Sequence, residues 1–217
     1  MSIVRNEDGS GQVLRTRLDK GTIHSEPAGT NGVAVLVNFN PVDRACISYD
    51  LRFDANFEWS LGGKLPGLQG AAPGISPSAP GGGNDSDGAW SGRVMWLGPG
   101  AYSWAGPSNM AVSYMYHPGQ VSQYGDNVRW NVAFQRGRWE HIKVCYAMNT
   151  VGKSNGTLAA WVNGSQVLSS TDFVYRTRGD LHIDAIAWSL FRGGNTMDWA
   201  APRTNYVDID NVIVGTF

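Results

Sequence analysis

The chain has 217 residues and a formal net charge of −1, with only 16% charged residues but 28 glycines and 9 tryptophans. This profile suits one large all-β domain with many turns, and it excludes a disordered chain or a coiled coil. The chain lacks the strong positive charge of a nucleic-acid-binding protein, and no apolar run approaches the ~18 residues of a membrane span. We therefore expect a protein that binds neither nucleic acid nor a membrane. We also expect a monomer.

The first thirty residues are polar and predict one or two edge strands joined by turns. Residues 1–5 show no charged segment followed by an apolar one, which is the pattern of a secretory leader. Either the protein is not exported by this route, or the sequence starts after a leader that has been removed. We expect a secreted, extracellular protein.

Alternation of apolar and polar residues predicts a series of short strands. It is clearest at 45–53, where Ile47, Tyr49 and Leu51 alternate with polar side chains. The pair Asn163-Gly164 between two such runs predicts a tight hairpin. The predicted strands are 33–37, 45–53, 90–97, 111–116, 127–134, 139–148, 157–162, 166–168, 183–191 and 207–214. Many short strands with no helical periodicity predict a single all-β domain over 1–217, an antiparallel β-sandwich or β-jelly roll.

Two glycine-rich segments interrupt this pattern. The block Gly62-Gly63-Lys64-Leu65-Pro66-Gly67-Leu68 is unlike a regular strand interior, so we predict a stiff loop where a strand leaves the sheet. Residues 70–89 predict a long loop, which in a compact domain is often functional. A linker between two domains is the competing interpretation, and the similar strands on both sides disfavour it.

Polar side chains share faces on two predicted strands. Ser91 and Arg93 are two residues apart, as are Tyr114 and Tyr116, so each pair points to one side of its strand. Each pair alone is ordinary, either a solvated face or core packing. Together with Lys64 they form a coherent set for binding the carboxylate of a sugar.

The same segments resemble the family 14 polysaccharide lyases, which act on alginate or glucuronate-containing chains. The resemblance rests on the block around Lys64, on Ser91-Gly92-Arg93 and on Tyr114-Met115-Tyr116, and it extends from about Arg44 to the C-terminus. It implies a β-jelly roll with the active site in the cleft of a concave sheet. The functional lysine, serine, arginine and two tyrosines of that family then match Lys64, Ser91, Arg93, Tyr114 and Tyr116.

The resemblance implies cleavage of an acidic polysaccharide by β-elimination, with no cofactor and no catalytic metal. Arg93 is the best candidate for binding the uronate carboxylate, because its planar fork can bind two oxygens. Tyr114 or Tyr116 is a candidate base, acid or both, and Lys64 is either the base or, if it stays charged, an electrostatic stabiliser. Ser91 positions a hydroxyl or donates to the leaving oxygen. Lys64, Arg93, His117 and Trp104 are the candidate substrate-binding residues. His141 alternates on a strand face opposite Ile142, and His24 and His182 have no evident partner; all three favour structural or solvated roles.

The main alternative function is a non-catalytic, lectin-like β-sandwich that binds acidic polysaccharide. Exposed aromatic rings would stack on sugars in such a module; the candidates are Tyr102, Trp104, Trp130 and Trp199. A glycoside hydrolase needs two carboxylates beside the bond. No suitable glutamate pattern appears among the four glutamates, which disfavours hydrolysis.

Two further features concern stability. Cys46 and Cys145 favour buried free thiols, with one cross-strand disulfide as the alternative. Asp208 and Asp210 lie in the last predicted strand and offer carboxylates to a structural Ca²⁺, although a solvated strand face is favoured.

Overall fold

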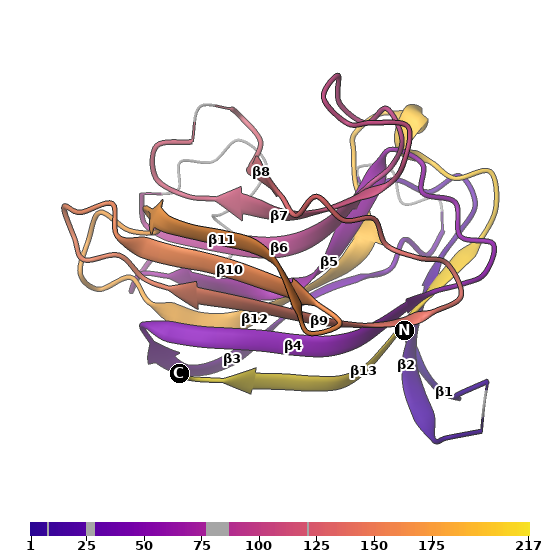
Figure 1. Ribbon diagram of the computed structural model, residues 1–217, viewed down its shortest axis with the longest axis horizontal. Coiled ribbons are helices and arrows are strands. Elements are labelled where there is room, and N and C mark those ends of the chain that lie inside the picture. The colour runs from indigo at the N-terminus through magenta and orange to yellow at the C-terminus, as the bar shows by residue number, and fades with distance from the viewer. Residues whose placement is uncertain (8, 25–28, 77–86, 121) are drawn as a thin grey trace.

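The protein is described by a computed structural model that covers residues 1–7, 9–24, 29–76, 87–120 and 122–217. Two antiparallel sheets pack face to face as a sandwich, which confirms the predicted fold class (Figure 1). In the part of the chain that the structure describes, no helix has the length and apolar character needed to cross a membrane.

The first sheet has seven strands in the order β1-β2-β13-β4-β9-β10-β11. Their bounds, in that order, are Ser2–Arg5, Gln12–Leu18, Asn205–Gly215, Arg44–Phe53, Trp139–Ala147, Gly156–Val162 and Ser165–Phe173. The second sheet has six strands in the order β3-β12-β5-β6-β7-β8. Their bounds are Val33–Val42, Ile183–Arg192, Gly62–Ala71, Ala89–Leu97, Met110–Tyr116 and Asp126–Arg129. A 3₁₀ turn, η1 (Met197–Trp199), precedes the last strand.

The core lies between the sheets and is built from the apolar side of each alternating strand. On β6, Trp90, Val94 and Trp96 point into this core, as their spacing predicts. On β4, Tyr49 and Leu51 do the same. The opposite residues of β6 therefore face outward on the six-stranded sheet.

The block around Lys64 is a strand and not the predicted loop. β5 runs through it as a central strand, paired with β12 on one side and β6 on the other. Its glycines serve close packing: a Cβ on Gly63 would clash with the ring of Trp96, and one on Gly67 with the carbonyl of Gly92. Pro66 lies at a register shift between Leu65 and Gly67, a position where a central strand tolerates proline.

The other predicted strands are largely found, with changed ends. The predicted strand at 127–134 stops at Arg129, because Asn131 has a positive φ of 56° and turns the chain. β11 is longer than predicted, since this polar edge strand lacks the alternation that would reveal it. Of the predicted loop at 70–89, residues 77–86 lie outside the described residues.

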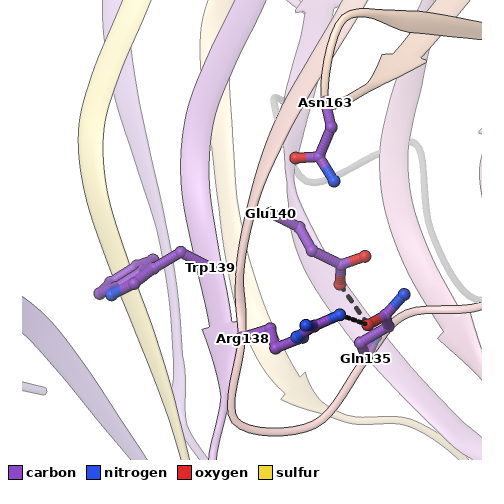
Figure 2. Close-up of a pocket in the computed structure, with 5 residues that line it drawn as sticks. All are labelled: Gln135, Arg138, Trp139, Glu140 and Asn163. Atoms are coloured by element: carbon purple, nitrogen blue, oxygen red, sulfur yellow. Dashed lines mark hydrogen bonds between the residues drawn. The ribbon is translucent and has the colours of Figure 1, made fainter.

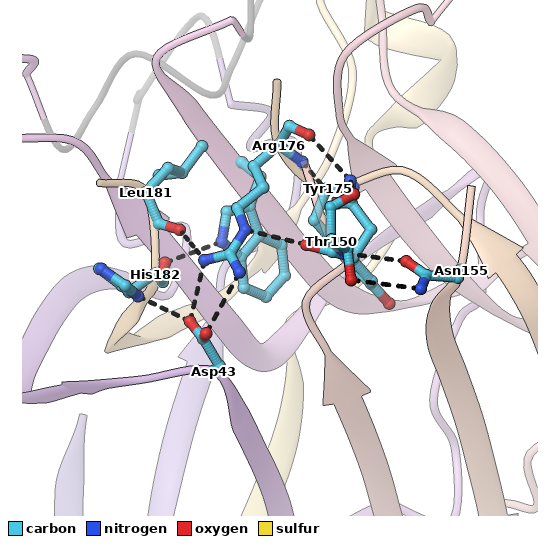
Figure 3. A network of polar contacts seen from close by, with 9 residues as sticks. Asp43, Thr150, Asn155, Tyr175, Arg176, Leu181 and His182 are labelled. Atoms are coloured by element: carbon cyan, nitrogen blue, oxygen red, sulfur yellow. Dashed lines mark hydrogen bonds and ion pairs between the residues drawn. The ribbon is translucent and has the colours of Figure 1, made fainter. Parts of the chain in front are cut away.

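A network of polar contacts fixes one corner of the sandwich, where the chain passes from β3 to β4 (Figure 3). The Arg176 guanidinium donates to both oxygens of Asp43, at 2.9 and 3.1 Å, and to the carbonyl of Leu181. His182 contacts the same carboxylate at 2.6 Å. Because β3 and β4 belong to different sheets, Asp43 ties the segment before β12 to the junction between them.

Cys46 and Cys145 form a disulfide, so the favoured interpretation as free thiols is wrong and the alternative is right. The two residues are direct register partners on β4 and β9, although 99 positions separate them in sequence. The antiparallel register brings their Cα atoms to 4.0 Å.

Candidate active site

Most of the predicted site residues meet on the outer face of the six-stranded sheet, in neighbouring rows that cross the strands. Register partners in an antiparallel sheet point to the same face, so each row forms one line of side chains. The first row is Phe191, Lys64, Met95, Val112 and Arg129; the second is Gly67, Arg93, Tyr114 and Asn127; the third is Gln69, Ser91 and Tyr116.

The register shift in β5 decides which side chains reach this face. Lys64 and Gln69 are five residues apart, so strict alternation would place them on opposite faces. The shift between Leu65 and Gly67 reverses the alternation. Leu68 therefore enters the core, while Gln69 joins Ser91 and Tyr116 on the outer face.

Lys64 is buried, with 8% of its surface exposed. Its Nζ lies 3.1 Å from the Met95 sulfur and 3.8 Å from the ring centre of Tyr114. Burial, and then the charge of Arg93, holds the pKa of Lys64 well below its ordinary value of 10.5. The site therefore favours a neutral amine at this position.

Arg93 lies beside the two tyrosines. Its Cζ is 5.6 Å from the ring centre of Tyr114 and 5.4 Å from that of Tyr116. Its Nε is buried without a hydrogen-bond partner in the described residues, and burial lowers the pKa of the guanidinium. Across the described parts of the chain, no carboxylate forms an ion pair with Arg93 or Lys64. A buried guanidinium beside a lysine, with no carboxylate counter-charge among the described residues, suits the binding of an anion.

Tyr114 and Tyr116 form a hydrogen-bonded pair, with 3.2 Å between their hydroxyl oxygens. The Gly125 N–H donates to the Tyr114 oxygen at 3.1 Å. Burial, and then the neighbouring Tyr116, raises the pKa of Tyr114 far above that of a free phenol. Tyr114 therefore keeps its proton and can donate it.

Two phenols from the other sheet support the site from below. Tyr49 on β4 donates to the carbonyl of Pro66 at 3.1 Å, and Tyr146 on β9 donates to the carbonyl of Gly92 at 2.7 Å. Both tyrosines are fully buried. They hold the backbones of β5 and β6 at the residues that flank Lys64 and Arg93.

The remaining predicted residues lie at or near the same face. Ser91 is buried between Gln69 and Tyr116 in the third row. His117 directly follows β7, where its ring nitrogens contact Asp126 at 3.0 Å and the Pro118 carbonyl at 2.9 Å. Both nitrogens are thus engaged within the protein.

Aromatic side chains cover one end of the face. Tyr102, Trp104 and Trp199 pack against the outer cluster that contains Tyr114 and Tyr116, and they come from the segment before β7 and from η1. Trp130 does not belong to this group. It is a core residue with 1% exposure, so it offers no stacking surface to a sugar.

Several polar or sulfur-containing residues at the site were not among the residues predicted from the sequence, including Gln69, Met95, Asn127 and His24. His24 stacks on Phe191 with 4.6 Å between ring centres, beside the first row. Partial burial, and then the charges of Lys64 and Arg93, lowers its pKa. The signal for Met95 was its spacing from Ser91 and Arg93 on the same strand. No local pattern linked His24 to β5 or to β12, because both strands are distant from it in sequence.

A separate pocket of about 330 Å³ lies at the start of β9, in the other sheet (Figure 2). Its lining residues are Gln135, Arg138, Trp139, Glu140 and Asn163. Of these five, Glu140 is the only acid, and it accepts the Gln135 N–H at 2.9 Å. A lone, engaged carboxylate does not provide the pair that glycoside hydrolysis needs.

The carboxylate of Asp208, the candidate Ca²⁺ ligand, is already paired with two arginine side chains. Its carboxylate accepts hydrogen bonds from Arg15 at 2.7 Å and from Arg52 at 2.7 Å. Within the described ranges, no group of three or more histidine, cysteine, aspartate or glutamate side chains is placed to hold a metal ion.

Comparisons with known proteins agree with this fold. A crystal structure of the marine family 14 alginate lyase from Aplysia kurodai matches all of this chain and 87% of its own, with a TM-score of 0.84 and 26% identity. The structure of alginate lyase Aly36B matches 93% of this chain and 80% of its own, with a TM-score of 0.76 and 26% identity. Alginate lyase vAL-1 from Chlorella virus, at 18% identity and a TM-score of 0.77, shares the fold.

One curated relative, Exolysin from Paramecium bursaria Chlorella virus 1, is 25% identical over 197 residues. The match covers 82% of this chain but only 30% of that protein, so the chain spans about a third of its length.

The family comparison extends the resemblance toward the N-terminus. The sequence model of polysaccharide lyase 14 matches residues 6–212, so it includes β2 and β3, which the recognised motifs did not reach. Because the match covers nearly the whole chain, the protein belongs to the polysaccharide lyase 14 family, a family of lyases.

Proposed function

We propose that this protein cleaves an acidic polysaccharide by β-elimination, with alginate as the first substrate to test. The observation that carries the proposal is the pair of basic side chains, Lys64 and Arg93, that faces outward beside two tyrosines without a carboxylate partner in the described residues. Alginate is favoured because a variant of alginate lyase Aly36B, 25% identical to this chain, is known in complex with alginate tetrasaccharide. Binding without cleavage, as in a lectin-like module, is the alternative outcome.

The reaction removes the proton on C5 of a uronate and breaks the bond from C4 to the bridging oxygen. The two electrons of the C5–H bond form the C4=C5 double bond, and the leaving oxygen takes a proton. The C5 proton becomes acidic only when the charge of the adjacent carboxylate is neutralised, and this is the role of Arg93. No step requires a metal ion or another cofactor.

The acid and the base follow from the two altered pKa values. Lys64, whose depressed pKa favours the neutral amine, accepts the C5 proton. Tyr114, whose raised pKa keeps the phenol protonated, donates to the leaving oxygen. Tyr116 orients Tyr114 through their hydrogen bond. Ser91, on the neighbouring strand β6, is the register partner of Tyr116 and supports its position.

The disulfide lies on the outer face of the seven-stranded sheet, and none of the proposed catalytic residues comes from that face. We also propose an extracellular location, because a disulfide persists in oxidising compartments.

The test is the ultraviolet absorbance of the unsaturated product during incubation with polymannuronate, polyguluronate and polyglucuronate. We expect rising absorbance on at least one polymer. Lys64→Arg should lower the rate by about 10²-fold or more, because arginine stays protonated and cannot act as the base. Full activity of Lys64→Arg would contradict the role of base. A flat trace on all three polymers, with binding retained in calorimetry, would replace the lyase with a binding module.

A further inference from the structure

A further basic residue, Arg129, lies on the same outer face as the candidate active site. Arg129 ends β8 and is the register partner of Val112, so its side chain leaves the sheet on the face that carries Lys64. β5 and β8 are three strands apart, which is roughly 14 Å at about 4.8 Å per strand. This separation favours contact with a different sugar from the one that reacts.

The Arg129 side chain is held in place by aromatic stacking. Its Cζ lies 4.0 Å from the ring centre of Trp104. Tyr102 stacks on the same indole, with 5.2 Å between ring centres and 8° between planes. Arg129 and Tyr102 therefore both pack against the Trp104 ring.

The stacked arrangement leaves Arg129 able to bind an anion. A guanidinium that stacks on an indole keeps its N–H groups in its own plane, where they can bind a carboxylate with two hydrogen bonds. In the described residues, Arg129 forms no ion pair with a carboxylate. Because Arg129 and Tyr102 occupy part of the Trp104 ring surface, the exposed guanidinium is better placed than the indole to bind an anion.

We propose that Arg129 forms a distal subsite for the carboxylate of a neighbouring uronate, and that Trp104 is a positioning residue that holds Arg129. The inference rests on the proposed function, because it takes the ligand to be a polyuronate. It also changes the expected role of Trp104, which sequence reasoning treated as a direct contact with substrate.

The test compares Arg129→Gln, Trp104→Leu and the double variant on purified oligouronates of increasing length and on the polymer. Arg44→Gln is the matched control: this arginine is also exposed and lies over an aromatic ring, at 5.9 Å from the centre of Phe217, but it belongs to the seven-stranded sheet. For Arg129→Gln we expect KM on long chains to rise about three- to fivefold. The rise should be smaller on the shortest cleaved oligomer and should shrink as salt is added. Arg44→Gln should match the wild type.

The double variant separates positioning from direct contact. If Trp104 acts through Arg129, the double variant binds long chains no more weakly than Arg129→Gln alone. Additive losses would overturn the positioning role, and an Arg129→Gln variant equal to the wild type at every length would overturn the subsite.

Electrophoresis through a gel that contains polyuronate keeps this inference distinct from the proposed activity. If the wild type forms no unsaturated product but is retarded in the gel, and Arg129→Gln is retarded less, the activity fails while the subsite stands. If the gel retards neither protein and no product forms, both fail.

Discussion

At the scale of single residues, the site combines buried cations with protonated phenols. Lys64 lies against the Met95 sulfur and the Tyr114 ring, neither of which is a strong acceptor for an ammonium group. A charge in such surroundings costs stability, and the same cost depresses the pKa of the amine. The feature that suits Lys64 to act as a base therefore weakens the folded state.

This trade-off gives a testable change in stability. Lys64→Met should raise the free energy of unfolding at neutral pH by about 1 kcal/mol, because it removes a buried ionisable group. The folded pKa lies below 10.5, so the unfolded chain holds its proton more tightly and the penalty is complete below the folded pKa. The gain should fade as the pH rises through the folded pKa toward 10.5.

Urea unfolding at several pH values measures this gain. Lys143→Met is the control, because Lys143 is exposed on β9 and its replacement should change stability little. A Lys64→Met variant that is less stable than the wild type at neutral pH would show that the amine is well accommodated when charged.

At the scale of elements, β5 is the strand that builds the site. It is central in its sheet, and its register shift places Lys64 and Gln69 on one face although they are five residues apart. The carbonyls of Pro66 and Gly92 are anchored by Tyr49 and Tyr146. The position of Lys64 relative to Arg93 is therefore set by backbone contacts and not by a loop.

Close contact between β5 and β6 predicts a strong effect of one added methyl group. Gly67→Ala would place a Cβ against the carbonyl of Gly92 and the backbone of Arg93. We expect a loss of about 1–3 kcal/mol in stability together with reduced activity, since the strands must separate locally. Thermal unfolding and product absorbance measure the two effects.

Gly215→Ala is the matched control, because Gly215 also lies in a strand but has open space around its Cα. If Gly67→Ala is as stable and as active as Gly215→Ala, the packing account of the glycine-rich block is wrong.

At the scale of the whole molecule, the two sheets have separate tasks. The six-stranded sheet carries the cations and phenols, while the seven-stranded sheet carries the disulfide and supplies the supporting tyrosines. Cys46 and Cys145 alternate with core residues on their strands, so they face away from the sandwich interior. The disulfide therefore affects stability rather than chemistry.

Removal of the disulfide should make the molecule less stable without changing its turnover. The Cys46→Ser/Cys145→Ser variant should lose about 3 kcal/mol, since the bond closes a long loop and restricts the unfolded chain. Its kcat at low temperature should equal that of the wild type. Denaturant unfolding with and without reductant is the measurement. Reductant should lower the denaturant midpoint of the wild type and leave that of the double variant unchanged. A wild-type midpoint that reductant does not change would contradict the disulfide.

The sequence by itself determined the fold class and most of the candidate active site. Period-two alternation placed Ser91 with Arg93 and Tyr114 with Tyr116, because side chains two apart on a strand share a face whatever the tertiary context. The family was also evident, since its motifs are local in sequence.

The tertiary structure alone decided everything that depends on pairing between distant segments. The disulfide, the stacking of His24 on Phe191 and the stacking of Arg129 on Trp104 each join residues that only the strand register or a loop brings together. The glycine-rich block was mistaken for a loop because its residues are poor strand formers in isolation. In the sandwich, their missing side chains make room for Trp96 and for the backbone of β6, and this packing outweighs the local preference.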